Sequence, residues 1–215
     1  YTLSLHDALP IFTGTASNNN VLNCKLTSPT VSSSSTDMAV VQAGYSGGSF
    51  AGGNLVFDND TFQNGSTSYW AYGSSTSNLT QGHTITNCLL TGAYYYLLYS
   101  YYGGNFNISN NTVTSTSNGL AYGFYMYYTG NGLTFSNNNV NVTSTYSGQY
   151  MFYLYYSNYY VTGQTIFTNN NVTLTTTSGT KYSHYMPYNY NLEFANNTFT
   201  FTGTSSTIYC PYYAA

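Results

Sequence analysis

Residues 133–142 read LTFSNNNVNV, and this stretch decides the fold. Apolar side chains alternate at Leu133 and Phe135 before the asparagines, and again at Val140 and Val142 after them. Alternation with a period of two is typical of a β-strand with one buried face. Phe135 and Val140 are an odd number of positions apart, so one flat strand would point them to opposite faces. The chain must therefore bend at the asparagines, so that both strands face one interior.

The same phrase recurs along the chain in seven copies. The spacing between copies is irregular, which favours stacked coils with loops of variable length over a helical-pair repeat. No type I′ dipeptide, which would turn the two strands into a hairpin, lies at the bend. The copies are VLNCKL from Val21, FDNDTF from Phe57, ITNCLL from Ile85, ISNNTV from Ile108, FSNNNV from Phe135, FTNNNV from Phe167 and FANNTF from Phe194.

A third strand, rich in tyrosine, lies upstream of the repeated phrase. Examples are SYWAY from Ser68, AYGFYMYY from Ala121 and QYMFYLYY from Gln149. Glycine, serine and threonine runs, such as residues 115–119 and 129–132, separate the strands and predict corners. The sequence therefore predicts an all-β solenoid, a single-stranded parallel β-helix with three strands per coil and about seven coils.

These phrases, the coil length and the three-strand pattern resemble the pectate-lyase-type parallel β-helix repeats. Polysaccharide lyases, tailspike-like proteins and adhesin-like cell-surface proteins of bacteria and archaea share that scaffold. The resemblance covers the chain from about residue 18 onward and implies a right-handed coil. The F-x-x-N subset, as at 135–138 and 167–170, also resembles repeats of polymorphic outer-membrane adhesins, although their Gly-Gly-Ala-Ile companion motif is absent.

Stacking would place equivalent residues of successive coils above one another. We expect the anchor asparagine of each phrase to form a structural ladder, with amides donating and accepting hydrogen bonds along the axis. The next position supplies a second possible column, at Asn111, Asn138, Asn170 and Asn197. The anchor asparagines are Asn23, Asn59, Asn87, Asn110, Asn137, Asn169 and Asn196.

The cysteines predict neither a disulfide framework nor a zinc site. Cys24, Cys88 and Cys210 are odd in number and lack metal-ligand spacing. Cys24 and Cys88 follow equivalent anchors two coils apart, beyond the roughly 7 Å of Cα separation that a disulfide spans. We expect free thiols.

Charged residues make up only 3% of the chain, with no arginine and only Lys25 and Lys181 as strong cations. A phosphate backbone would find almost nothing to pair with, so we expect no nucleic-acid partner. The acids in the repeats are Asp37, Asp58, Asp60 and Glu193, and the histidines are His83 and His184.

No nucleophile, base and orienting group can be assembled from these residues, so we expect no enzyme, no catalytic residue, no metal and no cofactor. Asp58 and Asp60 leave open a calcium site, although two surface carboxylates are more often only solvated. His83 falls at an inward strand position and is interpreted as a core or corner histidine. His184 lies in a tyrosine-rich strand with no acid beside it.

The tyrosines are the feature most suited to binding. If Phe124 and Met126 point inward, the alternate side chains form an outward aromatic strip. Such a strip suits stacking against sugars or burial in a protein interface. Alternatively, the tyrosines only stabilise the sheet through cross-strand contacts. The strip comprises Tyr125, Tyr127, Tyr153, Tyr155 and Tyr185.

A row of outward threonines, such as Thr173, Thr175 and Thr177, leaves ice or mineral binding as a further alternative.

Residues 1–12, YTLSLHDALPIF, resemble translated sequencing-adapter read-through, so we expect this segment to be non-native and set aside His6 and Asp7. Residues 13–215 are then expected to be a β-helix fragment, truncated at both ends and continuous with flanking repeats of a parent chain.

The sequence has no run of the roughly 18–20 apolar residues that a membrane span needs. Its polar but uncharged composition, dominated by Asn, Thr, Ser, Gly and Tyr, favours an extracellular or cell-surface location. We therefore expect a non-catalytic structural or adhesive segment, with glycans or surface proteins of a host or neighbouring cell as partners. The alternative is a module that binds or cleaves polysaccharide, for which the scaffold resemblance is the argument.

Overall fold

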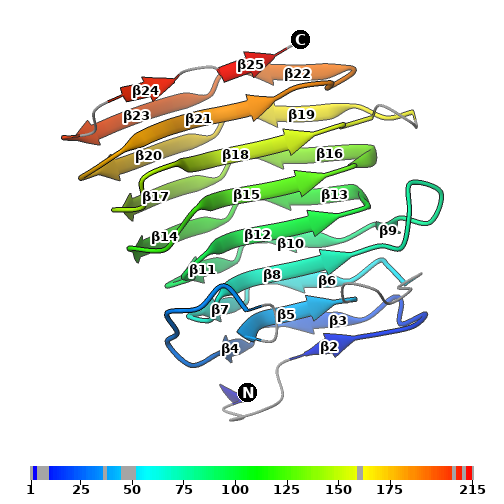
Figure 1. Cartoon of the computed structure of the whole chain (residues 1–215). Helices are drawn as coiled ribbons and strands as arrows, with labels where there is room; N and C mark the ends of the chain where they lie inside the picture. Colours follow the sequence, from blue (N-terminus) through cyan, green and yellow to red (C-terminus); the bar gives the residue numbers. More distant parts are fainter. Residues whose placement is uncertain are drawn as a thin grey trace.

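The computed structural model describes residues 2–3, 10–35, 38–44, 52–158, 162–204, 207–209 and 212–214 of the 215-residue chain. All regular elements in these ranges are β-strands. The strands pair in parallel and stack into a prism, with early strands at one end and late strands at the other (Figure 1). The predicted all-β solenoid of about seven coils is confirmed.

Each coil contributes one strand to each of three sheets. We name the sheets by their outward side chains as the threonine, mixed and tyrosine sheets. The threonine sheet contains β1 (Thr2–Leu3), β4 (Lys25–Thr27), β7 (Thr61–Gln63), β11 (Leu89–Thr91), β14 (Thr112–Ser117), β17 (Asn139–Ser144), β20 (Asn171–Thr176) and β23 (Thr198–Gly203). The mixed sheet contains β3 (Asn20–Leu22), β6 (Val56–Asp58), β10 (Thr84–Thr86), β13 (Gly103–Ser109), β16 (Gly130–Ser136), β19 (Thr165–Thr168) and β22 (Leu192–Ala195), with β9 (Thr80–Gln81) beside β13. The tyrosine sheet contains β2 (Ile11–Phe12), β5 (Ala39–Ala43), β8 (Thr67–Tyr72), β12 (Tyr96–Tyr101), β15 (Tyr122–Tyr127), β18 (Gln149–Tyr155), β21 (Thr180–Met186) and β24 (Thr207–Tyr209), with β25 (Tyr212–Ala214) beside β21.

The core consists of the inward side chains of all three sheets, stacked in columns along the axis. In β16 and β17, Phe135 and Val140 are both buried, as the odd spacing between them required. Phe135 stacks on Phe167 of the next coil with ring centroids 5.0 Å apart. Burial of apolar surface contributes about 25 cal/mol per Å², so repetition of such contacts in every coil is the main stabilising term. One core column contains Phe57, Ile85, Ile108, Phe135 and Phe167.

The bend between the mixed and threonine sheets lies at the anchor asparagines, as predicted. All seven have a left-handed backbone, with φ between 55° and 58°, and all seven side chains are exposed. This conformation is costly for most L-residues but accessible to asparagine, whose short polar side chain tolerates it. The repeated asparagine therefore specifies the corner.

The continuous amide ladder lies one position after the anchor asparagines, in the second of the two expected columns. Asn138 Nδ2 donates to Asn170 Oδ1 (3.0 Å) and to the Ile108 carbonyl (2.9 Å), and the backbone N–H of Asn138 donates to the same Oδ1 (3.0 Å). Asn111 donates to Asn138 in the same way. The left-handed anchor directs its own side chain to solvent and turns the next side chain inward. Among the anchor amides, the hydrogen bond joining two of them runs from Asn59 Nδ2 to Asn23 Oδ1 (2.7 Å).

The solenoid includes the described strand residues of the segment 1–12, whose sequence resembles adapter read-through. Ile11 and Phe12 form β2, which pairs with β5, and the Phe12 ring lies 6.2 Å from that of Phe57. Thr2 and Leu3 form β1, which pairs with β4. Whatever its origin, this segment extends two of the sheets, whereas His6 and Asp7 lie outside the described residues.

We expect Asn138→Ala to lower the free energy of unfolding by about 3 kcal/mol, because at least two buried polar groups would lose their partner at about 1–3 kcal/mol each. Asn137→Gly is the matched control on the adjacent residue. Glycine adopts the left-handed conformation freely, so its cost should stay below about 1 kcal/mol. Urea unfolding followed by circular dichroism measures both variants, and equal losses at the two positions would contradict the assignment of the ladder.

Candidate functional site

The outward side chains of the tyrosine sheet and of its adjoining corner form four columns of stacked rings, which we call the aromatic face. Successive rings in a column come from successive coils and lie in register. The five tyrosines of the strip predicted from the sequence all belong to it. The columns are Tyr96, Tyr122, Tyr150, Tyr182 and Tyr209; Trp70, Tyr99, Tyr125, Tyr153 and Tyr185; Tyr72, Tyr101, Tyr127 and Tyr155; and Tyr102, Tyr128, Tyr156 and Tyr188.

The rings of the aromatic face cover one another's planes. Tyr125 and Tyr153 have centroids 4.9 Å apart and planes 5° apart, and Tyr127 and Tyr155 have centroids 5.0 Å and planes 1° apart. A ring inside a column has another ring above and below it, so solvent meets its edge and not its plane. Stacking of a sugar onto ring planes, one use expected for the strip, is therefore restricted to the column ends. What the face offers is a lattice of ring edges.

The corner column was not recognised in the sequence. Tyr102, Tyr128, Tyr156 and Tyr188 all have a left-handed backbone, with φ of 54° or 55°. This conformation costs an L-residue about 1–2 kcal/mol. Stacking on rings above and below offsets that cost at about 0.5–1.5 kcal/mol per aromatic pair. The available signal was the tyrosine pair that ends three successive tyrosine strands, at 101–102, 127–128 and 155–156.

The hydroxyl groups of Tyr125, Tyr127 and Tyr153 in the aromatic face stay protonated at neutral pH. Burial, followed by repulsion from neighbouring phenols, raises the pKa of Tyr127 to about 12 and raises the pKa of Tyr125 and Tyr153 further. A phenolate nucleophile or base is therefore not available on these residues. The hydroxyls can serve as neutral hydrogen-bond donors and acceptors.

Asp58 and Asp60 lie on opposite sides of the sheet wall, because the left-handed Asn59 separates them. Asp58 points outward and accepts hydrogen bonds from Thr86 Oγ1 (2.9 Å) and Asn87 Nδ2 (2.7 Å). Asp60 is only 2% exposed and points inward. The two carboxylates therefore do not form the joint calcium site considered from the sequence. In the part of the chain that the structure describes, no group of three or more His, Cys, Asp or Glu residues is placed to hold a metal ion.

Asp60 occupies the asparagine-ladder column. Its Oδ1 accepts a hydrogen bond from the backbone N–H of Cys24 (2.7 Å), as a ladder asparagine would. Its Oδ2 takes the place of a donating amide and has no partner. Burial is the main cause that raises the pKa of Asp60 to about 6. Asp60 therefore interrupts the ladder and is not a surface acid.

His83 and His184, the histidines of the described residues, both point into the interior. His83 is fully buried, shares a 2.9 Å hydrogen bond with the Tyr69 hydroxyl and another with Thr80 Oγ1, and burial lowers its pKa to about 3. His184 shares a hydrogen bond with Ser183 (2.8 Å), and burial lowers its pKa to about 4. Neither ring combines exposure with an acidic partner, as general acid–base catalysis at a substrate would require.

Lys181 and the cysteines also lack catalytic surroundings. Lys181 is buried, its Nζ donates to the Tyr146 carbonyl, and burial lowers its pKa. Cys24 and Cys88 are free thiols, as predicted, and burial raises the pKa of Cys88 to about 12. Asp37 and Cys210 lie outside the described residues.

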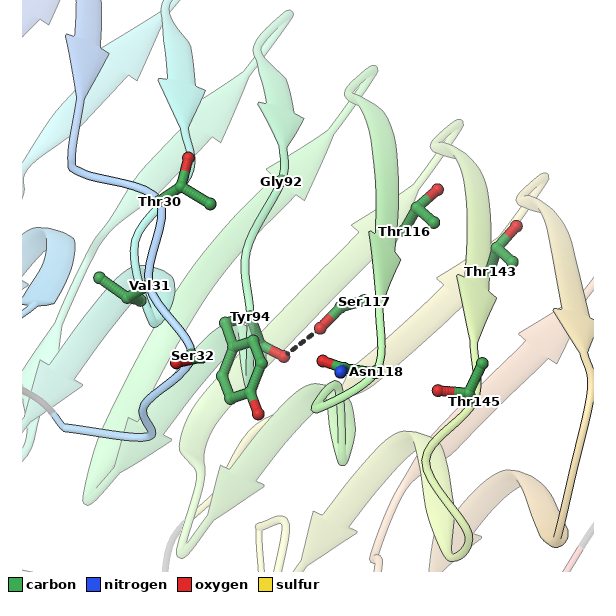
Figure 2. Close-up of a pocket in the computed structure, with 10 residues that line it drawn as sticks. All are labelled: Thr30, Val31, Ser32, Gly92, Tyr94, Thr116, Ser117, Asn118, Thr143 and Thr145. Atoms are coloured by element: carbon green, nitrogen blue, oxygen red, sulfur yellow. Dashed lines mark hydrogen bonds between the residues drawn. The ribbon is translucent and has the colours of Figure 1, made fainter.

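A groove of about 420 Å³ lies at the corner between the threonine and tyrosine sheets (Figure 2). The segment at Ser32 forms one wall, Tyr94 lies in the centre and Asn118 lies beside it. Ser117 Oγ donates to the Tyr94 carbonyl (2.7 Å), and Gly119 lies so close to the Tyr94 ring that a Cβ atom there would be 2.2 Å from it. A second hollow of about 400 Å³ shares Ser32, Tyr94 and Asn118.

Tyr94 differs from the tyrosines of the aromatic face, because among the described residues it has no stacked ring partner. One ring surface packs on Gly119 and the ring borders the groove. An aromatic ring together with uncharged hydroxyl and amide groups can contact a sugar. The sequence did not reveal this groove, because residues 30–32 and 116–119 meet only in the coiled chain.

Comparison with protein-family models, with curated proteins and with solved structures returned no match. Among the described residues, no helix has the length and apolar character needed to cross a membrane. The function must therefore be argued from the surfaces of this chain.

We expect Asp60→Asn to raise the free energy of unfolding at pH 8 by about 1–3 kcal/mol, because the new amide can donate where the carboxylate cannot. An acid whose pKa rises on folding binds more protons when folded, so its contribution falls as the pH rises from about 4 to 6. His83 and His184, whose pKa values fall on folding, act in the opposite direction. Urea unfolding of the parent chain and of Asp60→Asn from pH 4 to 8 isolates the contribution of Asp60, because both proteins retain the two histidines. A difference in the free energy of unfolding that does not change with pH would contradict this assignment.

Proposed function

We propose that this solenoid is a non-catalytic structural and adhesive segment of an extracellular or cell-surface protein. The observation that carries the proposal is the aromatic face, which continues through successive coils without a charged side chain in its columns. The side chains of each coil lose conformational freedom when their rings become half-buried in this face. Contact with a partner would offset that loss.

The interior supports a structural role. Three parallel ladders run through the stacked coils, and the asparagine column joins the coils from Asn111 to Asn197, so this part of the prism resists bending as a unit. Lys181 is buried, which leaves Lys25 as the exposed strong cation in the described residues. Few sites therefore remain for proteases that cut after basic residues, and this resistance suits an extracellular location.

The edges of the aromatic face suit adhesion through many weak contacts. Neighbouring columns are 6.2 Å apart at Tyr125 and Tyr127, and 6.0 Å apart at Tyr153 and Tyr155. Each edge combines apolar carbon with a neutral hydroxyl, the combination that makes tyrosine common in protein interfaces. Glycans or surface proteins of a host or neighbouring cell are the partners that this chemistry fits.

A polysaccharide-binding module is the second candidate, and the groove at Tyr94 is the observation that favours it. The resemblance to pectate-lyase-type repeats points to the same class of ligand. Cleavage has less support, because the described lining residues include no carboxylate, histidine, lysine or cysteine that could activate one of the serine or threonine hydroxyls there.

An adhesion assay on two pairs of variants separates the contribution of the tyrosine hydroxyls from that of ring stacking. Tyr127→Phe with Tyr155→Phe keeps the stacked rings and removes two hydroxyls, so we expect near-normal stability but weaker retention of protein-coated beads on dextran or mucin surfaces under flow. Tyr127→Ser with Tyr155→Ser removes the rings as well and should also destabilise the fold by about 1–3 kcal/mol. Retention that survives both pairs of substitutions would leave the aromatic face with a purely structural role.

The groove is tested with the full chain on a glycan array, together with a search for released sugars. Tyr94→Ala should weaken any binding at the groove by about tenfold, equivalent to about 1.4 kcal/mol. Leu22→Ala, which truncates an exposed apolar side chain of the mixed sheet outside both the groove and the aromatic face, is the control and should bind like the parent chain. Equal binding by both variants would reject the groove as the sugar site, and released sugars would reject the non-catalytic proposal.

A further inference from the structure

The outer face of the threonine sheet has a composition that the other two faces lack. In β14, β17, β20 and β23, each of the three successive outward positions is threonine or asparagine. No charged or large apolar side chain interrupts this part of the face. We call these residues the threonine grid: Thr112, Thr114 and Thr116; Asn139, Asn141 and Thr143; Asn171, Thr173 and Thr175; Thr198, Thr200 and Thr202.

The grid is regular in two directions. The three ladders that join these strands each pair six consecutive residues without a register shift. Neighbouring strands are therefore about 4.7–4.9 Å apart and alternate outward residues about 6.6 Å apart. Thr173 and Thr175 occupy the grid as expected from the sequence, but Thr177 lies beyond the end of β20.

Contacts along the columns hold the side chains in place. The Thr175 and Thr202 hydroxyls are 2.9 Å apart, and Asn171 Nδ2 donates to Asn139 Oδ1 (3.2 Å). Threonine is also restricted at χ1 by its branched Cβ. Little side-chain entropy then remains to be lost when the face meets an ordered surface.

The mixed sheet is the internal comparison. In β19 and β22, which pair in parallel in the same way and lie in the same coils as β20 and β23, the outward positions include Ile166 and Glu193. Strand formation alone thus accepts charged and large apolar residues on an outer face of this prism. The uniform threonine and asparagine composition of the grid needs another explanation.

We propose that the threonine grid binds ice. The spacing between its strands is close to the short repeat of oxygen atoms on the prism plane of hexagonal ice, so hydroxyl and methyl groups along each column can order a matching layer of water. A charged side chain would retain its own hydration shell and disturb that layer, and the grid carries none. This function is separate from adhesion through the aromatic face, because the two faces belong to different sheets.

The test uses the full chain from a host that does not attach N-linked glycans. Asn141 and Asn171 begin Asn-Val-Thr sequons, and a glycan at either would cover the grid. We expect thermal hysteresis and inhibition of ice recrystallisation from the parent chain. Thr173→Tyr should abolish most of both activities, because a bulky ring in the middle of the grid separates the flat face from ice.

Thr134→Tyr is the matched control, since Thr134 is also a half-buried outward threonine in mid-strand but lies on the mixed sheet. Tyrosine suits strands, and circular dichroism checks that each variant folds. Asn141→Tyr, at an exposed grid position, is a second variant with the same expected loss if Thr173→Tyr does not fold. Absence of thermal hysteresis in the parent chain, or equal loss from Thr134→Tyr, would overturn the proposal. The Tyr127→Phe and Tyr155→Phe protein should keep its ice activity, which separates this test from that of adhesion.

Discussion

The left-handed bend at the anchor asparagines is the constraint on which the rest of the structure depends. It reverses the parity of the alternating pattern, so that Phe135 and Val140 face the same interior although an odd number of residues separates them. Because every coil bends at the same place, equivalent residues stack, and the core, the amide ladder and the outer columns follow from that register. The anchors do this through the backbone, while their own amides remain in solvent.

Much of the fold could be predicted from the sequence, because burial patterns in strands have a period of two and the bend falls on a recognisable residue. The outward position of Tyr125 and Tyr153 follows from the same parity. Parity does not reveal which of two adjacent asparagines forms the ladder, since that depends on where a left-handed backbone directs each side chain. The groove at Tyr94 could not be predicted either, because its walls come from different coils.

The three faces of the prism share one interior but differ in chemistry. The aromatic face presents ring edges, the threonine grid presents short hydroxyl and amide groups, and the mixed sheet presents no single type. The core requires only that inward residues be apolar and of suitable volume, so outward residues are free to differ. Asp60 is instructive because it is an inward residue that departs from its column, with one oxygen left without a partner.

The direction of the inter-coil hydrogen bonds has a mechanical consequence. These bonds run along the prism axis, so tension between the two ends loads each interface between coils in series. The coils contact mainly their immediate neighbours, so the weakest interface opens first and releases a length of chain, which lowers the tension on the other interfaces until the next one opens. A tether built in this way extends in steps and dissipates work at each step, which protects whatever is bound at its end from a sudden pull.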